Sequence, residues 1–318
     1  MDTATTQAEL RRRVDAWRQG GETVGFVPTM GALHEGHLAL VRRCRELADR
    51  TVVSVFVNPT QFNEASDLER YPRTPERDAE LLAGEGTDLL FLPPVDEIYP
   101  PGDATRVEVA GPAEGLEGAH RPGHFRGVAT VVARLFHLVR PHLAVFGEKD
   151  AQQLAVVRRM TADLHIPVDV VGHPTVREED GLAMSSRNAL LSPGDRAAAP
   201  VLHRALVAAR DRVAAGERSA DALRRTMAEV LAAEPRVHAV EYAEVVDGES
   251  FQPLDRLPES GRVVLPIAVR VGGEGAGDGS ATGNVTAMVR LIDNFQLDMS
   301  DFDETPSAAV GTRGADVP

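Results

Sequence analysis

The sequence predicts an α/β protein: a Rossmann-like, doubly wound parallel sheet domain followed by a smaller α+β domain with antiparallel strands. Through the first half of the chain, short β-rich runs alternate with helix-length amphipathic stretches, which is typical of βαβ units. Several of these runs are almost continuously apolar, as strands covered on both faces require. After about Val176, two helical stretches are followed by three extended segments, an order typical of α+β domains.

The first half contains five expected strands and four expected helices. The expected strands are Thr23–Pro28, Thr51–Val57, Asp88–Leu92, His142–Gly147 and Val168–Gly172. The expected helices lie near Gly36–Asp49, Thr74–Gly84, Phe125–Val139 and Ala151–Leu164. A chain of 318 residues with 43% hydrophobic content has enough apolar residues for two domains, which we place at 1–175 and 176–298.

The second half contains two expected helices, Asp195–Ala215 and Ala220–Ala233, and then three expected strands. These strands are Ala239–Val246, Arg262–Val271 and Val285–Ile292. The Gly-, Ala- and Asp-rich stretch Gly272–Gly283 predicts a flexible inserted loop between the last two strands. Residues 299–318 contain too few apolar side chains to dock, and we expect a disordered tail there.

Charge and cysteine content limit the classes of partner and compartment. The net charge of −14 argues against a nucleic-acid surface, which needs clustered Lys and Arg, but it permits a small anionic ligand. Cys44 is the only cysteine, so neither an intrachain disulfide nor a multi-thiolate metal site can form. The chain shows no apolar signal region and no run of about 20 apolar residues, so we expect a cytoplasmic protein with no membrane partner.

The strongest local motif follows the first expected strand, where Thr29-Met30-Gly31 leads to a helix that carries His37. Glycines at 31 and 36 allow close backbone approach to a ligand, and N–H groups at a helix start favour phosphate. His34 and His37 lie three residues apart on one helical face and offer imidazole donors to a polyphosphate. The alternative is a pair of surface or capping histidines, which an isolated H-x-x-H motif would favour.

A second motif follows another strand, where Gly147 leads into Glu148-Lys149-Asp150 and a helix with Gln152 and Gln153. Lys149 would lie at the carboxyl end of a parallel strand, where its charge can meet phosphate. A surface salt bridge with Glu148 or Asp150 is the alternative.

The third motif is Gly181–Arg187, in the segment that joins the two halves. The hydroxyls of Ser185 and Ser186 and the guanidinium of Arg187 can together enclose a phosphate. Helix capping by serine is the alternative.

Two further polar stretches are candidates for substrate contacts. Asn58-Pro59-Thr60-Gln61-Phe62 follows a strand directly, and its amides could recognise a carboxylate or hydroxyls. Arg121–Gly127 combines two arginines with His124 just before a helix, as in a mobile loop that closes over an anionic substrate. A plain turn is the alternative for both.

Taken together in their order along the chain, these motifs resemble those of the pantothenate synthetases. The resemblance extends from about residue 21 to residue 296 and rests on Pro28–His37, Phe56–Phe62, His124–Gly127, Gly147–Asp150 with Gln152-Gln153, and Gly181–Asn188. H-x-G-H alone is shared by a wide nucleotidyltransferase superfamily. Five motifs in order are far more specific.

The resemblance implies a ligase that joins pantoate and β-alanine with ATP and Mg²⁺ through a pantoyl adenylate, releasing AMP and pyrophosphate. It implies ATP contacts at Met30, Gly31, Ala32, Leu33, His34, Glu35, Gly36, His37, Gly147, Glu148, Lys149, Asp150, Val176, Met184, Ser185, Ser186 and Arg187. Of these, His34, His37, Lys149, Ser185, Ser186 and Arg187 would be catalytic, with His37 the assigned proton donor. Substrate contacts are implied for Gln61, Gln153, Asn58, Arg121 and His124.

The resemblance further implies a homodimer whose first domain binds ATP and pantoate under a lid formed by the second. No residues of the sequence form an evident protein-only Mg²⁺ site, as expected for an ion held mainly by phosphates and water. Two other functions stay open: another H-x-G-H adenylyltransferase with a different acceptor acid, and a non-catalytic ATP-binding sensor. A tRNA-charging synthetase is disfavoured by the net charge.

Overall fold

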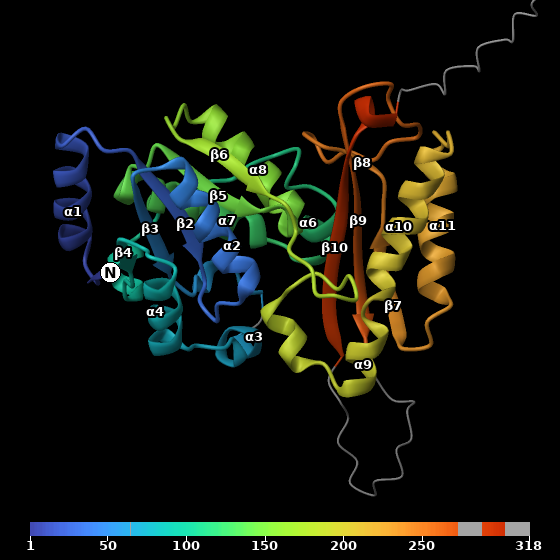
Figure 1. The fold of residues 1–318 in the computed structure, drawn as a ribbon, viewed down its shortest axis with the longest axis horizontal. Helices are drawn as coiled ribbons and strands as arrows, with labels where there is room; N and C mark the ends of the chain where they lie inside the picture. Colours follow the sequence, from blue (N-terminus) through green and yellow to red (C-terminus); the bar gives the residue numbers. More distant parts are fainter. Residues whose placement is uncertain (64, 273–287, 303–318) are drawn as a thin grey trace, which may run out of the picture.

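The computed structural model describes residues 1–63, 65–272 and 288–302, which form two sheets with separate cores (Figure 1). The first sheet has six strands in the order β1-β4-β3-β2-β5-β6, and every pair is parallel. Its strands are β1 Asp2–Ala4, β2 Val24–Thr29, β3 Arg50–Val55, β4 Leu89–Phe91, β5 Leu143–Gly147 and β6 Asp169–His173. The predicted doubly wound sheet is confirmed.

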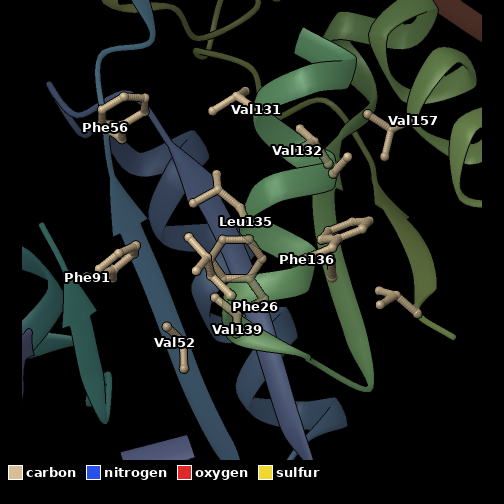
Figure 2. Close-up of a cluster of buried hydrophobic side chains, with 14 of the residues drawn as sticks. Phe26, Val52, Phe56, Phe91, Val131, Val132, Leu135, Phe136, Val139 and Val157 are labelled. Atoms are coloured by element: carbon tan, nitrogen blue, oxygen red, sulfur yellow. The ribbon is translucent and has the colours of Figure 1, made fainter. Parts of the chain in front are cut away.

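Helices cover both faces of this sheet. Alternate residues of each strand point to opposite faces, so each strand contributes to two cores. Phe26 and Val52 enter one core with α7, and the adjacent Val27 and Val53 enter another with α2. Figure 2 shows the first of these cores, in which Phe136 of α7 lies beside Phe26 of β2 with the ring centroids 6.5 Å apart. The helices up to β6 are α1 Gln7–Gln19, α2 Glu35–Leu47, α3 Ala65–Arg70, α4 Pro75–Gly84, α5 Val95–Ile98, α6 Leu116–His120, α7 His124–Val139 and α8 Ala151–Asp163.

The second sheet is antiparallel, in the order β10-β9-β7 with β8 also paired to β9. It contains β7 Val237–Ala243, β8 Val246–Asp247, β9 Arg262–Val271 and β10 Val289–Asp298, and it follows α9 Pro193–Ala198, α10 Val201–Ala214 and α11 Ala220–Ala232. Alternate β9 residues such as Leu265 and Ile267 pack under α10 and α11, whereas Val264 contacts Ala151 and Ala155 of α8. Figure 1 accordingly shows β9 and β10 standing between α8 and α10.

Three predictions about the second half are corrected. The single helix expected over Asp195–Ala215 is two helices, because Pro200 has no N–H to continue α9 and instead caps α10. The strand expected over Ala239–Val246 is divided into β7 and β8, and the last strand starts at Val289 and continues to Asp298 rather than ending at Ile292. Residues 285–287 lie outside the described residues.

Met299–Phe302 form a 3-10 helix with Met299 buried, so the predicted tail does not begin at residue 299. Residues 303–318, and 273–283 of the predicted insertion, lie outside the described residues. The division of the chain at residue 175 stays a prediction. In the described part of the chain, no helix has the length and apolarity needed to cross a membrane.

An ion-pair network joins the two sheets across α6. The guanidinium of Arg290 on β10 binds both carboxylate oxygens of Glu117 and, at 2.7 Å, Glu241 Oε2. Tyr242 on β7 donates its hydroxyl to Glu117 Oε1 at 2.6 Å. Glu117 is buried, so these bonds replace the water that its carboxylate loses, and they fix the second sheet against the first.

Candidate active site

A cavity of about 240 Å³ opens at the carboxyl ends of β2, β3, β5 and β6. The sheet order changes direction between β2 and β5, and ligands of open α/β sheets bind at such switch points. An apolar part of the cavity wall comes from α7. It contains Val128, Val131, Val132 and Leu135.

Most of the residues predicted to contact ligands line this cavity. They are Met30, His34, Gly36, His37, Asn58, Gln61, Arg121, His124, Gly147, Lys149, Asp150, Gln153, Val176, Met184, Ser185, Ser186 and Arg187. Five predicted ATP contacts are not part of its lining: Gly31, Ala32, Leu33, Glu35 and Glu148. Gln152, beside Gln153, is buried and instead accepts from Glu117 N and donates to the carbonyl oxygen of Pro112.

The backbone N–H groups that lead into α2 are already bonded within the protein. The buried carboxylate of Asp78 accepts from Ala32 N at 3.0 Å and from Leu33 N at 2.9 Å. His34 caps the helix, since its Nδ1 accepts from Gly36 N at 3.2 Å. A Cβ on Gly36 would meet the His34 ring within 2.9 Å, so glycine is needed there. The N–H groups of Ala32, Leu33 and Gly36 are thus not free as expected, and phosphate binding at this turn stays a prediction.

The same contacts determine what the two histidines can donate. His37 Nδ1 accepts from His34 N at 3.4 Å, as His34 Nδ1 does from Gly36 N. With both Nδ1 atoms acting as acceptors, each neutral ring carries its proton on Nε2. The ring centroids lie 4.1 Å apart. The capping role and the ligand role of these histidines are thus compatible.

Both imidazoles are held neutral. Burial lowers the pKa of His37 to about 3, with His34 and Lys149 as further lowering charges and Asp150 opposing them. Burial, followed by the charge of Lys149, also lowers the pKa of His34. At neutral pH the pair therefore presents two uncharged N–H donors.

Lys149 brings a positive charge to the same cavity. Its side chain is 18% exposed, and Nζ lies 3.8 Å from Asp150 Oδ2. Burial would raise the pKa of Asp150, but the positive charges of Lys149 and Arg187 outweigh it and lower that pKa. The alternative of a Lys149–Asp150 ion pair is thus observed: both residues line the cavity, and the Asp150 side chain is 48% exposed.

The Gly181–Arg187 loop also contributes to the cavity lining, through residues 184–187. Ser185 caps a 3-10 helix at Ser186–Leu190 by accepting from Arg187 N at 3.2 Å. The hydroxyl of Ser186 bonds to Tyr71, whose pKa is raised by burial. The capping alternative for the serines is therefore correct for Ser185, while both serines and Arg187 also line the cavity.

A relay of hydrogen bonds orients the amide of Gln61. Tyr99 Oη donates to Asn58 Oδ1 at 2.7 Å, and Thr60 Oγ1 donates to the same oxygen at 3.0 Å. Asn58 Nδ2 then donates to Gln61 Oε1 at 3.0 Å. Gln61 must consequently turn its N–H donors towards the cavity, where Nε2 meets Met30 Sδ.

His124 and Arg121 hold the backbone of the same turn. His124 Nδ1 donates to Gln61 O at 2.8 Å, and Arg121 lies 3.3 Å from His124 Nε2. Burial, together with the charge of Arg121, lowers the pKa of His124 to about 4. The expected closing loop at Arg121–Gly127 ends in α7, which begins at His124. Whether this loop moves stays a prediction.

Sequence reasoning missed three residues that shape the site: Asp78, Tyr71 and Tyr99. Asp78 lies in a predicted helix and Tyr99 in a stretch with no predicted element, and each acts through a partner distant in sequence. A buried acid in a helix has no local sequence pattern that distinguishes it from a surface acid.

These features define a class of protein: a doubly wound α/β enzyme whose switch-point cavity is lined by neutral imidazoles, a lysine and hydroxyls, groups able to bind phosphate, and by side-chain amides. The sequence model of the pantoate–β-alanine ligase family matches residues 2–296. The chain belongs to this family, so the predicted family and the predicted enzyme class, a ligase, are confirmed.

Individual relatives support the assignment over nearly their whole length. The pantothenate synthetase of Cereibacter sphaeroides is 56% identical over 292 residues, covering 92% of this chain and 98% of that protein. That of Moorella thermoacetica is 48% identical over 301 residues, covering 95% and 100%.

Solved structures agree in fold. Pantothenate synthetase from Thermus thermophilus has a TM-score of 0.82 at 51% identity, covering 93% of this chain and 99% of that one. The pantoate–β-alanine ligase of Francisella tularensis, solved in complex with β,γ ATP and β-alanine, has a TM-score of 0.70 at 30% identity, covering 93% and 97%.

Proposed function

We propose that this chain condenses pantoate with β-alanine to pantothenate, using ATP and forming a pantoyl adenylate. The observation that carries the proposal is the composition of one cavity. It combines donors and charges for a triphosphate, from His34, His37 and Lys149, with amides for an acid, from Gln61 and Gln153, of which Gln61 is oriented by Asn58. Family membership supports the same substrates.

In the first step, a pantoate carboxylate oxygen attacks the α-phosphorus of ATP, and the bond to the bridging oxygen breaks to release pyrophosphate. Negative charge moves onto the leaving oxygens, where Lys149, Arg187 and the hydroxyls of Ser185 and Ser186 stabilise it. Gln61 and Gln153 hold pantoate in line. In the second step, the amine of β-alanine attacks the acyl carbon, AMP leaves, and the amine loses a proton.

His34 and His37 act as hydrogen-bond donors through Nε2. With a pKa of about 3, His37 is not protonated at neutral pH in the free protein. The triphosphate brings negative charge that stabilises an imidazolium, so a proton-donor role for His37 would begin only once ATP is bound.

Mg²⁺ would supply positive charge to the leaving pyrophosphate. Among residues 1–63, 65–272 and 288–302, no group of three or more His, Cys, Asp or Glu side chains is arranged to hold a metal. Asp150 is the one carboxylate among the described residues that line the cavity. One carboxylate fits Mg²⁺, which keeps several waters and binds mainly through substrate phosphates.

Two experiments test the function. Incubation with ATP, pantoate and β-alanine should yield AMP rather than ADP. Turnover with pantoate, and not with other acids, would exclude another H-x-G-H adenylyltransferase. ATP and pantoate without β-alanine should yield pyrophosphate and a tightly held acyl-AMP. ATP binding without AMP formation in the presence of both cosubstrates would instead indicate a sensor.

The proposal includes a cytoplasmic homodimer. The single cysteine fits a reducing compartment, and the family resemblance points to a dimer. Light scattering of the purified chain at several concentrations would test the dimer, and a mass of 34.2 kDa, that of one chain, would contradict it.

A further inference from the structure

Two neighbouring residues of β10, Asp293 and Asn294, reach the candidate active site from the second sheet. Both are buried, at 3% and 5% exposure. Asn294 Nδ2 donates to the carbonyl oxygen of Glu148 at 2.9 Å and to that of Lys149 at 2.8 Å. These carbonyls belong to the peptide planes on either side of the Lys149 α-carbon. One amide thus fixes the backbone from which the Lys149 side chain starts.

Asp293 makes a similar connection to the Gly181–Arg187 loop. Its carboxylate binds Arg177 through two bonds of 2.6 and 2.9 Å. Arg177 in turn donates to the carbonyl oxygen of Gly181 at 3.0 Å and to that of Asn294 at 3.3 Å. Gly181 starts the loop that carries Ser185, so β10 contacts both elements that bring cations and hydroxyls to the cavity.

We propose that Asn294 is a positioning residue that holds Lys149 on the triphosphate, and that Asp293 does the same for the Gly181–Arg187 loop through Arg177. The inference rests on the proposed function and extends it to residues of the second sheet. A lysine side chain has four rotatable bonds, so its direction depends on a fixed starting backbone. A displacement of about 1 Å at such a group lowers rates by about a hundredfold.

The first test compares Asn294→Ala and Asn294→Asp with a matched control. Aspartate keeps the size of Asn294 but removes both N–H donors and places a charge against two carbonyl oxygens. A donor role therefore predicts that kcat falls at least about tenfold in both variants, and at least as far in Asn294→Asp. A space-filling role predicts instead that kcat falls further in Asn294→Ala than in Asn294→Asp. If Asn294→Ala does not fold, the kcat of Asn294→Asp alone tests the proposal.

Tyr242→Phe is the control, because it also removes a hydrogen bond made by the second sheet, in this case to Glu117 of α6. Its bond to Glu117 does not touch Lys149 or the loop, so we expect kcat within about twofold of the wild type. A kcat of Asn294→Ala equal to that of Tyr242→Phe would overturn the proposal.

The second test is a double-mutant cycle with Lys149→Ala, read as the Kd of ATP by calorimetry. If Asn294 acts through Lys149, Asn294→Ala changes the Kd by less than about twofold in the Lys149→Ala background. An equal effect in both backgrounds contradicts the proposal. Arg177→Lys keeps the positive charge but loses the bidentate geometry of the guanidinium, and it should raise the Kd of ATP at least about threefold. An unchanged Kd would overturn the proposed role of Asp293.

ATP binding is measured without turnover, so the two proposals can fail separately. A wild-type chain that binds ATP but releases no pyrophosphate with pantoate refutes the proposed function. If the wild-type chain turns over normally and the Asn294 variants have the same kcat as the wild type, only the positioning role is refuted.

Discussion

Asn58→Asp is predicted to reverse the amide of Gln61 and to weaken pantoate binding. In the wild type, Tyr99 and Thr60 donate to Asn58 Oδ1, so Asn58 Nδ2 must donate to Gln61 Oε1. An aspartate has only acceptors, and Gln61 would turn Nε2 towards it. Its carbonyl oxygen would then face the cavity where N–H donors are expected to meet the acid.

The magnitude follows from the hydrogen bond that is lost. A bond to a charged partner contributes about 1.5–3 kcal/mol, which corresponds to about tenfold to a hundredfold in an equilibrium constant. We therefore expect the KM for pantoate to rise about tenfold to a hundredfold, with the KM for ATP changed by less than about threefold. AMP release measured with pantoate varied at saturating ATP checks this.

Tyr99→Phe is the matched control, since Thr60 still donates to Asn58 Oδ1 and the relay keeps its direction. Its KM for pantoate should rise by no more than about threefold. An unchanged KM for pantoate in Asn58→Asp, or an equal rise for ATP and pantoate, would refute the reasoning.

Three further predictions concern catalysis, pH and packing. Lys149→Ala should lower kcat about tenfold to a thousandfold in the AMP assay, and unaltered turnover would remove Lys149 from the mechanism. His37, with a folded pKa of about 3, binds a proton more readily when unfolded, so it destabilises the fold as pH falls from about 6.5 towards 3, by up to about 1.4 kcal/mol per unit. His37→Gln should accordingly reduce the stability difference between pH 6.5 and 4.5 in urea unfolding, and an unchanged difference would contradict the assigned pKa. Phe136→Ala empties the core of Figure 2 and should lower the free energy of unfolding by about 3–5 kcal/mol, whereas a loss below about 1 kcal/mol would show that the core collapses around the gap.

The first sheet was predictable because its strands carry their own pattern. Almost continuous apolar runs such as Leu143–Gly147 predict strands buried on both faces, and the structure places them within one or two residues of the predicted bounds. β1 was missed, because three residues carry too little pattern and form a strand only beside β4. The helix α1 was missed although Thr6 and Glu9 form a capping box that the sequence displays.

The candidate site was predictable as a set of motifs but not in its bonding. Glycines and histidines in Met30–His37 indicate a strand-to-helix turn, yet nothing local shows that Asp78 uses the loop N–H groups or decides whether the two histidines cap α2. The direction of a hydrogen bond depends on whether the neighbouring atom in space is a donor or an acceptor. The nitrogen that carries the proton in His34 and in His37 therefore became evident only from the folded chain.

The sequence by itself determined the class of fold, the order of its motifs and the family, because apolar periodicity and motif chemistry are local. Tertiary structure alone decided which distant residues complete the site. Asn294 lies 146 residues from Glu148, whose carbonyl it binds, and Tyr99 lies 41 residues from Asn58. Such pairs form because two sheets pack together or a loop folds back, and the burial that makes them strong exists only after the chain has closed around them.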